Sequence, residues 1–302
     1  MYPKNILNMI GHTPLLNLNL NIPKAKILVK LETYNLTGSI KDRMALFMLI
    51  AAKARGELKP GATIIEATTG NTGIAFSALA RIFGYKMVAI MTADQTVERV
   101  KMMQSFGAKI ILTPESAGVA GAIKKRDSLA KKTSYSWIPN QFDNPDNVLA
   151  HQKLTGPEIY DQLNGKIDYL VHGVGTGGTL VGIAKYLKKY FPALKVVAVE
   201  PSESAVLSGG KMGFHNIAGI GEGFIPSIVD LKIIDQVVKV SSKEAIRETK
   251  KLALKGLLVG YSSGANIAAI KKLAKANIKV KTYLTIFADR GERYLSTKLF
   301  DK

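Results

Sequence analysis

Short apolar strands alternate with helical segments along almost the whole chain, and this alternation limits the possible folds more than any other feature. The expected strands cover 15–18, 27–32, 63–66, 86–91, 109–112, 136–138, 169–172, 195–199, 236–240, 257–260 and 282–287. The expected helices cover 6–10, 44–55, 74–83, 97–106, 118–131, 147–161, 180–190, 242–255 and 265–274. Such a pattern predicts an α/β fold of mostly parallel sheets flanked by helices.

The length of 302 residues favours two lobes or one large lobe, and a hydrophobic content of 47% is sufficient for a real core. A polar break at 141–147 (QFDNPDN) is the expected boundary between lobes. The chain has no cysteine, which excludes disulfides, zinc–thiolate sites and a cysteine nucleophile. No apolar run reaches the length of a membrane span and the start lacks a signal-peptide pattern, so we expect a cytoplasmic protein with no membrane association.

The formal net charge of +19 raises the alternative of a nucleic-acid-binding protein. The lysines do not form one block, however. They occur as pairs and triplets at helical spacing, for example in 124–126 and 131–132. Since no recognised nucleic-acid module accompanies them, we expect no nucleic-acid partner. Steep salt-dependent binding to DNA would argue for the alternative.

Lys41 follows a loop of small polar residues, 35–39, and precedes an apolar helical run. Ser39 is the expected N-cap, which places Lys41 in the first turn of the helix. A cation there opposes the helix dipole, so the pKa of the amine should fall, and a neutral amine is what Schiff-base chemistry requires. The alternative is a solvent-exposed lysine at a helix start.

Three loops of small residues each separate an expected strand from an expected helix. The loop 173–179 (GVGTGGT) is the strongest candidate for binding a phosphate, because its N–H groups and hydroxyls can converge on an anion at a helix N-terminus. It lacks the Gly-Lys-Ser/Thr of a Walker A motif, and a tight turn is its alternative. The loop 68–72 (TTGNT) suits a carboxylate, and 262–264 (SSG) is a third hydroxyl-rich loop. Their alternatives are a polar connection and a plain N-cap.

A lysine, an anion cradle, a carboxylate-type loop and a hydroxyl loop together describe a site for pyridoxal 5'-phosphate. The chain resembles the cysteine synthase and cystathionine β-synthase family, the fold type II (β-family) pyridoxal phosphate enzymes, nearly from end to end. The matching motifs are 10–15 (IGHTPL), 38–43 (GSIKDR), 69–74 (TGNTGI), 173–179, 219–221 (GIG), 262–264 and 291–296 (GERYLS). The resemblance implies a two-lobe, tryptophan synthase β-like fold, with a smaller mobile lobe of 36–144 and a larger phosphate-binding lobe of 1–35 and 145–302.

The resemblance also implies roles for individual residues. Lys41 would bind the cofactor covalently and later move the substrate's α-proton, and Ser262, with Ser263 as the weaker candidate, would pair with the cofactor's ring nitrogen. The cofactor's phosphate would be held by Gly175, Thr176, Gly177 and Thr179. The substrate carboxylate would be bound by Thr68, Thr69, Asn71, Thr72 and Gln141, with Asn71 also contacting the cofactor's phenolic oxygen. No metal ion is expected.

The implied reaction is β-replacement or β-elimination on a sulfur amino acid or an activated serine, in a homodimer whose possible serine acetyltransferase partner the motifs leave open. Glu222 stands where the family usually has a small apolar residue. A carboxylate there would repel hydrosulfide and favour an ammonium-bearing second substrate, or activate water. We therefore predict consumption of L-cysteine with release of hydrogen sulfide, forming lanthionine or serine. The alternatives are that Glu222 faces solvent or an ion-pair partner in an ordinary cysteine synthase making cysteine from O-acetylserine and sulfide, or that the chain is a pseudoenzyme.

Overall fold

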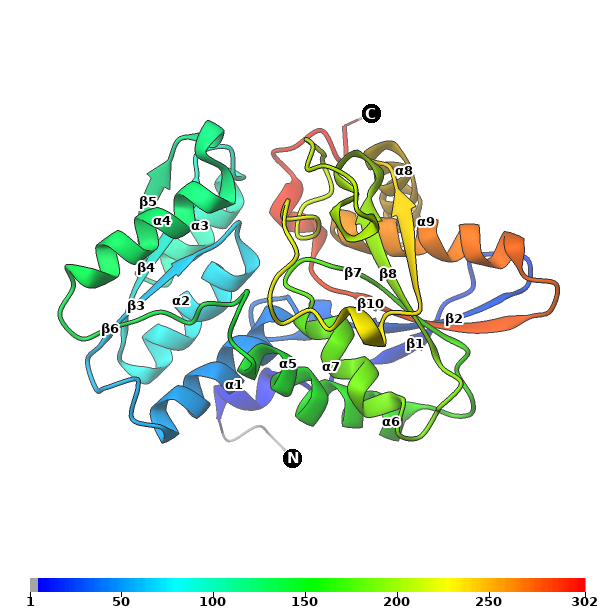
Figure 1. The fold of residues 1–302 in the computed structure, drawn as a ribbon, viewed down its shortest axis with the longest axis horizontal. Helices are drawn as coiled ribbons and strands as arrows, with labels where there is room; N and C mark the ends of the chain where they lie inside the picture. Colours follow the sequence, from blue (N-terminus) through cyan, green and yellow to red (C-terminus); the bar gives the residue numbers. More distant parts are fainter. Residues whose placement is uncertain (1–4, 302) are drawn as a thin grey trace.

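The computed structural model describes residues 5–301, and two sheets dominate it, one on each side of the view in Figure 1. The larger sheet has six strands in the order β1-β2-β10-β7-β8-β9, and the smaller has four in the order β5-β4-β3-β6. All neighbouring strands are parallel except the antiparallel pair β1 and β2. The prediction of mostly parallel sheets flanked by helices is confirmed.

The six-stranded sheet is buried on both faces. Its strands are β1 (Leu15–Asn17), β2 (Ala25–Leu31), β7 (Tyr169–Gly173), β8 (Lys195–Pro201), β9 (Gln236–Val240) and β10 (Lys281–Phe287). Along β8, Val197 and Val199 pack against α8 (Ser242–Ala253) and α9 (Tyr261–Ala276), whereas Val196 and Ala198 pack against the opposite layer with α6 (Gly156–Gln162) and α7 (Gly178–Leu187). Because successive side chains point to opposite faces, burial on both sides requires the continuous apolar runs seen in the sequence.

The four-stranded sheet follows the same rule. Its strands are β3 (Thr63–Ala67), β4 (Lys86–Thr92), β5 (Lys109–Thr113) and β6 (Ser136–Trp137). Ile64 and Met87 face a core shared with α1 (Lys41–Ala54), α2 (Asn71–Phe83) and α3 (Val97–Ser105). Ile65 and Ile90 face α4 (Gly118–Lys131) on the other side. Each sheet therefore has its own hydrophobic core.

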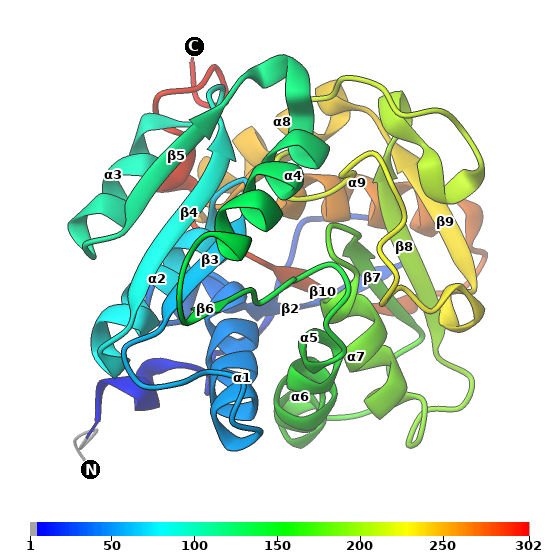
Figure 2. The ribbon, with the colours of Figure 1, turned by 60° about the vertical axis from the view of Figure 1, so that its left-hand side comes forward.

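Helix α1 lies between the two halves, where it packs against α2 of the smaller sheet and against α5 (Asp146–Ala150), as Figures 1 and 2 show. Helix α5 continues through a π-helical turn, η4 (His151–Thr155), into α6. Short 3-10 turns complete the chain: η1 (Ile6–Met9), η2 (Glu32–Tyr34), η3 (Glu115–Ala117), η5 (Ser202–Ser204), η6 (Val206–Ser208), η7 (Leu231–Ile233) and η8 (Gly291–Tyr294). The N-terminus of α1, which carries Lys41, is thus positioned by both halves.

Several local predictions are wrong, and three of them concern α1, the run 257–260 and α9. The N-cap of α1 is Ile40 rather than Ser39, although the Ser39 hydroxyl accepts the N–H of Lys41 at 3.3 Å. The expected strand 257–260 does not form, because only Val259 pairs, in an isolated antiparallel bridge to Arg290. Ser262 and Ser263 lie in the first turn of α9 and not in a loop, since the helix starts at Tyr261.

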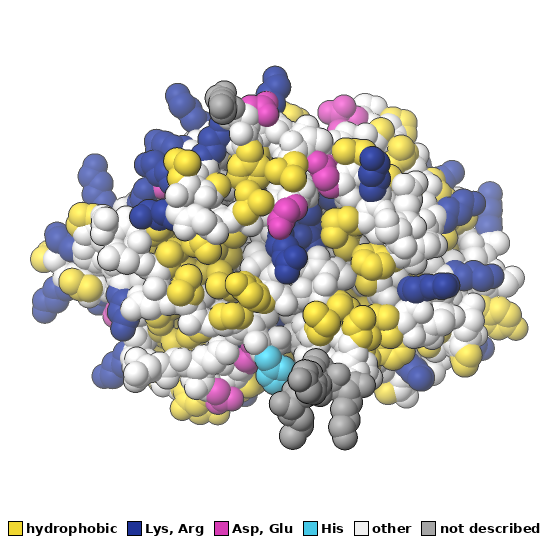
Figure 3. Space-filling model, turned by 180° about the vertical axis from the view of Figure 1, so that it is seen from behind, with side chains coloured by type: hydrophobic (Ala, Val, Ile, Leu, Met, Phe, Trp, Pro, Cys, Tyr) yellow, Lys and Arg dark blue, Asp and Glu magenta, His cyan; other side chains and the backbone are white. Residues whose placement is uncertain are grey.

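Within the described residues, no helix is both long enough and apolar enough to cross a membrane. Lysine and arginine side chains are spread over the face of the molecule drawn in Figure 3, with hydrophobic side chains between them. The basic charge that is scattered along the sequence is therefore also scattered on this face.

Candidate active site

A single cavity opens where the carboxyl ends of strands from both sheets meet. Strand β3 leads into its wall at 68–72, β7 leads into it at 173–179, and β10 ends just before Asp289. Apart from Ser263, the residues that the sequence placed in the site all line this cavity: Lys41, Thr68, Thr69, Asn71, Thr72, Gln141, Gly175, Thr176, Gly177, Thr179, Glu222 and Ser262. Carboxyl ends of parallel strands are the usual place for ligands, because the loops there are free of the sheet's own hydrogen bonds.

Lys41 is the first residue of α1 and its side chain lines the cavity. Burial lowers the pKa of its amine, while the carboxylates of Glu222 and Asp289 oppose that fall. The sequence predicted the direction of this shift from the helix dipole, whereas burial is its main cause in the structure. A lysine with a lowered pKa supplies more of the neutral amine that attacks a carbonyl.

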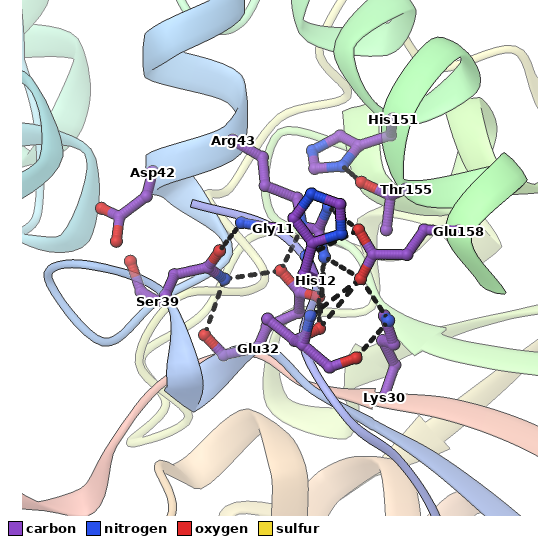
Figure 4. A network of polar contacts seen from close by, with 12 residues as sticks. Gly11, His12, Lys30, Glu32, Ser39, Asp42, Arg43, His151, Thr155 and Glu158 are labelled. Carbon is purple, nitrogen blue, oxygen red and sulfur yellow. Dashed lines mark hydrogen bonds and ion pairs between the residues drawn. The ribbon is translucent and has the colours of Figure 1, made fainter. Parts of the chain in front are cut away.

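The residues that follow Lys41 anchor its helix. Asp42 accepts hydrogen bonds from the backbone N–H of Thr37 at 2.6 Å and from the Thr37 hydroxyl. Arg43 donates to both oxygens of Glu32 and to both oxygens of Glu158 (Figure 4). The start of α1 is therefore held by Glu32 on η2 and Glu158 on α6, so the position of Lys41 is set by ion pairs beside it.

The loop between β7 and α7 forms an anion cradle. Gly177, the N-cap of α7, has a left-handed backbone with φ 83°, and a Cβ on Gly175 would lie 2.4 Å from the Gly219 carbonyl oxygen, so both positions require glycine. The Thr176 hydroxyl accepts from Asn147 at 3.0 Å, and the Thr179 hydroxyl lies 3.3 Å from Nε2 of His151. Backbone N–H groups and hydroxyls at a helix N-terminus are the donors that a phosphate requires.

The loop before α2 faces the cradle. The helix begins at Asn71, so Asn71 and Thr72 belong to its first turn, although the sequence analysis placed them before the helix. The Thr72 hydroxyl donates to Gln141 at 2.6 Å, and the Gln141 amide donates to the Ala67 carbonyl at 3.0 Å. The Thr68 hydroxyl accepts from the N–H of Gly70 at 3.0 Å. These bonds fix a second helix N-terminus against the cavity, which suits a carboxylate.

Asp289 joins this wall, and the sequence analysis missed it. The Asn71 amide donates to Oδ2 of Asp289 at 2.7 Å, and the Tyr294 hydroxyl donates to the same oxygen at 2.6 Å. Oδ1 of Asn71 and Oδ1 of Asp289 are buried without a hydrogen-bond partner. Since buried polar atoms are normally bonded, these two mark a place where a ligand can supply a partner. The position of Asp289 just after the last strand was the sequence signal that could have identified it.

Ser262 and Ser263 differ in their surroundings. Ser262 lines the cavity from the first turn of α9, whereas Ser263 does not line it and its hydroxyl oxygen is buried without a partner. His172, also missed by sequence reasoning, lines the cavity at the end of β7. Burial and the nearby charge of Lys41 lower its pKa to about 3, so it is neutral near pH 7.

Glu222 faces into the cavity. Its Oε1 atom lies 3.8 Å from the point that a Cβ on Gly175 would occupy, so its carboxylate stands over the anion cradle. Burial raises its pKa, and the positive charges of Lys41 and Arg99 oppose that rise. Among residues 5–301 no cation lies within ion-pair distance of it. Glu222 is partly exposed through the cavity, so of the two alternatives only the ion-paired one does not describe this arrangement.

Arg99, on α3, is the third residue that sequence reasoning missed. It lines the cavity and is only 5% exposed. Its guanidinium carbon lies 4.7 Å from the ring centre of Tyr294, and one of its nitrogens donates to Gln95 at 3.1 Å. A buried positive charge therefore lies in the wall that the smaller sheet contributes.

The residues present fit pyridoxal 5'-phosphate. The cradle of α7 suits the phosphate of this cofactor, and the Lys41 amine suits its aldehyde. The Ser262 hydroxyl suits the ring nitrogen, and the side-chain amide of Asn71, with its unpartnered oxygen, suits a polar substituent of the ring. A cavity of this kind between two mostly parallel sheets defines a pyridoxal phosphate enzyme of fold type II.

Comparisons with known proteins agree with this assignment to the pyridoxal phosphate enzymes. The profile described as "Pyridoxal-phosphate dependent enzyme" matches residues 6–289. Cysteine synthase of Staphylococcus aureus (strain Mu50 / ATCC 700699) is 44% identical over 300 residues, covering 98% of this chain and 96% of that protein. The chain belongs to the cysteine synthase family of pyridoxal phosphate-dependent enzymes.

Two solved structures show the same relationship. A hydrogen sulfide-producing enzyme from Fusobacterium nucleatum superposes with a TM-score of 0.92 at 44% identity, covering 98% of this chain and 90% of that one. Cysteine synthase from Entamoeba histolytica superposes with a TM-score of 0.94 at 40% identity, covering 100% of this chain and 92% of that one. The predicted family, fold and cofactor are thereby confirmed, and the chain is an enzyme.

Proposed function

We propose that this enzyme carries out β-replacement on L-cysteine, releasing hydrogen sulfide. The Cβ–S bond of the first cysteine breaks, and a new Cβ–S or Cβ–O bond forms to a second cysteine or to water. The proton of the attacking thiol or water leaves with the sulfide, so the products are lanthionine or serine and one molecule of hydrogen sulfide. The observation that carries the proposal is the carboxylate of Glu222, which stands over the anion cradle without an ion-pair partner among the described residues.

The chain's own residues have distinct tasks in this proposal. When bound, pyridoxal phosphate withdraws electrons from the substrate's α-carbon and so makes its proton removable. The Lys41 amine takes that proton and returns it, helped by its lowered pKa. Gly175, Thr176, Gly177 and Thr179 hold the phosphate, Ser262 pairs with the ring nitrogen, and Thr68, Thr69, Asn71, Thr72 and Gln141 bind the substrate carboxylate.

In this proposal, the charge of Glu222 determines which nucleophile reacts. Its negative charge disfavours the approach of hydrosulfide, because like charges in a cavity repel each other strongly. The same charge attracts an ammonium group, and a carboxylate whose pKa is raised by burial can also accept a proton from water. The relative from Fusobacterium nucleatum, described as hydrogen sulfide-producing, supports this direction.

The second candidate is an ordinary cysteine synthase that makes L-cysteine from O-acetyl-L-serine and sulfide. The observation that favours it is the 44% identity to the cysteine synthase of Staphylococcus aureus over nearly the full length of both chains. In either case we propose a cytoplasmic homodimer acting on a small amino acid, with the lobe of 36–144 closing over the substrate.

The test compares wild-type enzyme with Glu222→Gln, which keeps the shape and removes the charge. Sulfide and amino-acid products are quantified with L-cysteine alone, and then with O-acetyl-L-serine plus sulfide. We expect wild type to release sulfide from cysteine, and Glu222→Gln to lose about tenfold or more of that rate while gaining in cysteine synthesis. Glu292→Gln, an exposed carboxylate on η8, is the control. Wild type that releases no sulfide from cysteine, or unchanged products in Glu222→Gln, would refute the proposal.

A further inference from the structure

Arg99 and Glu222 are opposite charges in the walls of one cavity, and neither has an ion-pair partner within residues 5–301. The Nε–H of Arg99 is buried without an acceptor, in a residue that is only 5% exposed. Among residues 5–301, no carboxylate lies within ion-pair distance of Arg99, and no cation lies within that distance of Glu222. Arg99 is buried, whereas Glu222 is partly exposed to the cavity. A buried charge is normally paired, so an unpaired Arg99 that shares a cavity with an unpaired carboxylate indicates a ligand that carries both complementary charges.

The two charges come from different parts of the fold. Arg99 lies on α3 beside the smaller sheet, and its side chain packs directly against Gly70 in the loop 68–72. Glu222 lies on the loop after Gly219, over the anion cradle of α7. A ligand that contacts both therefore lies across the cavity, from the loop 68–72 to the cradle of the larger sheet.

The guanidinium is held in place rather than free to follow Glu222. Its guanidinium carbon lies over the ring of Tyr294, and one nitrogen is bonded to Gln95. Its Nε–H has no acceptor among the described residues, and a guanidinium N–H pairs well with a carboxylate oxygen. Tyr294 is itself fixed by its hydrogen bond to Asp289.

We infer that Arg99 and Glu222 together form the binding site for the second substrate, an α-amino acid thiol, with Arg99 taking its carboxylate and Glu222 its ammonium group. This inference rests on the proposed function, whose second nucleophile is a free L-cysteine. The new Cβ–S bond forms to the sulfur of the bound thiol, and the thiol proton leaves with the departing sulfide or acetate. Arg99 is thus a determinant of nucleophile specificity, distinct from the loop 68–72 that binds the first substrate.

The experiment charges the holoenzyme with O-acetyl-L-serine and supplies one thiol at a time. L-Cysteine carries both charged groups, cysteamine lacks the carboxylate, and 3-mercaptopropionate lacks the ammonium group. Hydrosulfide serves as the small reference nucleophile. The measured quantity is kcat/KM for each thiol, from the rate at which its thioether or cysteine product appears. Since O-acetylserine is the first substrate, the assay gives a result even where L-cysteine fails as a sulfide donor.

We expect wild type to favour L-cysteine over each truncated thiol by about 10- to 100-fold, as for the loss of one charged hydrogen-bonded contact. Arg99→Gln should lower kcat/KM for L-cysteine to about that of cysteamine and leave cysteamine unchanged. Glu222→Gln should lower kcat/KM for L-cysteine toward that for 3-mercaptopropionate, and should raise the values for the anions 3-mercaptopropionate and hydrosulfide because the like charge is gone. Arg99→Lys, which keeps the charge without the planar edge, should fall between wild type and Arg99→Gln. Lys101→Gln, an exposed position on the same helix, is the control.

Several outcomes would overturn the inference. If the wild-type enzyme does not distinguish L-cysteine from cysteamine, that result alone overturns the inference, without any variant. An Arg99→Gln enzyme that loses all four nucleophiles equally would assign Arg99 a structural role. A rise of the KM for O-acetyl-L-serine in that variant would place Arg99 in the first-substrate site. A panel that behaves as expected in an enzyme releasing no sulfide from L-cysteine would support the binding site and refute only the proposed first substrate.

Discussion

Replacing Glu158 by glutamine tests whether the buried ion pairs beside Lys41 hold the two halves of the fold. Glu158, on α6, accepts from both terminal nitrogens of Arg43, from Lys30, and from the backbone N–H groups of His12 and Thr13 at 2.9 Å each (Figure 4). Glutamine keeps the volume but replaces one acceptor oxygen by a donor. The two cations would then face only one carboxylate, that of Glu32, so an uncompensated positive charge would be buried.

The pKa of Glu158 gives the size of the effect. Burial alone would raise this pKa, but the hydrogen bonds and charges of Arg43 and Lys30 outweigh burial and lower it from 4.5 to about 2. At about 1.4 kcal/mol for each pKa unit, the folded state gains about 3 kcal/mol from the ionised form. A depressed pKa stabilises the fold above pH 4.5, and the stabilisation is lost as the pH falls toward 2. It should decline to about 1.5 kcal/mol at pH 3.

The assay is urea denaturation of the cofactor-free protein, followed by far-ultraviolet circular dichroism, at pH 7 and at lower pH. We expect Glu158→Gln to lower the free energy of unfolding by about 3 kcal/mol at pH 7, and the difference from wild type to shrink as the pH falls. Glu115→Gln, an exposed carboxylate on η3, should change the free energy by less than about 0.5 kcal/mol. A loss below about 1 kcal/mol at pH 7, or one independent of pH, would refute the reasoning.

Two further predictions concern the cofactor's surroundings. Gly175→Ala should weaken pyridoxal phosphate binding at least about tenfold in an absorbance titration, because its Cβ would lie 2.4 Å from the Gly219 carbonyl oxygen and push the cradle apart; unchanged affinity would contradict that geometry. Glu222→Gln should lower the pKa of the Lys41 amine further, because this carboxylate is the leading charge that opposes the effect of burial. The pH dependence of cofactor reloading should then move to lower pH, and an unmoved profile would show that the charge of Glu222 does not reach Lys41.

The fold could be predicted from the sequence because its strands are buried on both faces. Such strands appear as continuous apolar runs, and nearly every expected strand forms within a residue or two of its predicted limits. The failure at 257–260 has a physical cause. Val259 is buried, but Leu258 is 38% exposed and no parallel neighbour is available, so an apolar run alone did not make a strand.

Helix starts at the cavity were harder to predict. Asn71, Thr72, Ser262 and Ser263 belong to first helical turns, although small polar residues are typical of loops. In a first turn their N–H groups have no partner within the helix, so the helix can begin there and direct these groups at a ligand. Asn71, Thr72 and Ser262 line the cavity and Ser263 does not, and both helices begin about one turn earlier than the sequence predicted.

Arg99 shows what local sequence reasoning cannot reach. Arg99 lies in the helical run 97–101 together with Glu98 and Lys101, and such a charged context is typical of a solvated surface. Its guanidinium is covered by Tyr294 on η8, which packs against α3 from nearly two hundred residues later in the chain. Asp289 differs, because the end of the last strand is a position that the rule for parallel sheets singles out. A charge placed at a strand end is therefore predictable from sequence, whereas a charge buried by a distant aromatic ring requires the three-dimensional structure.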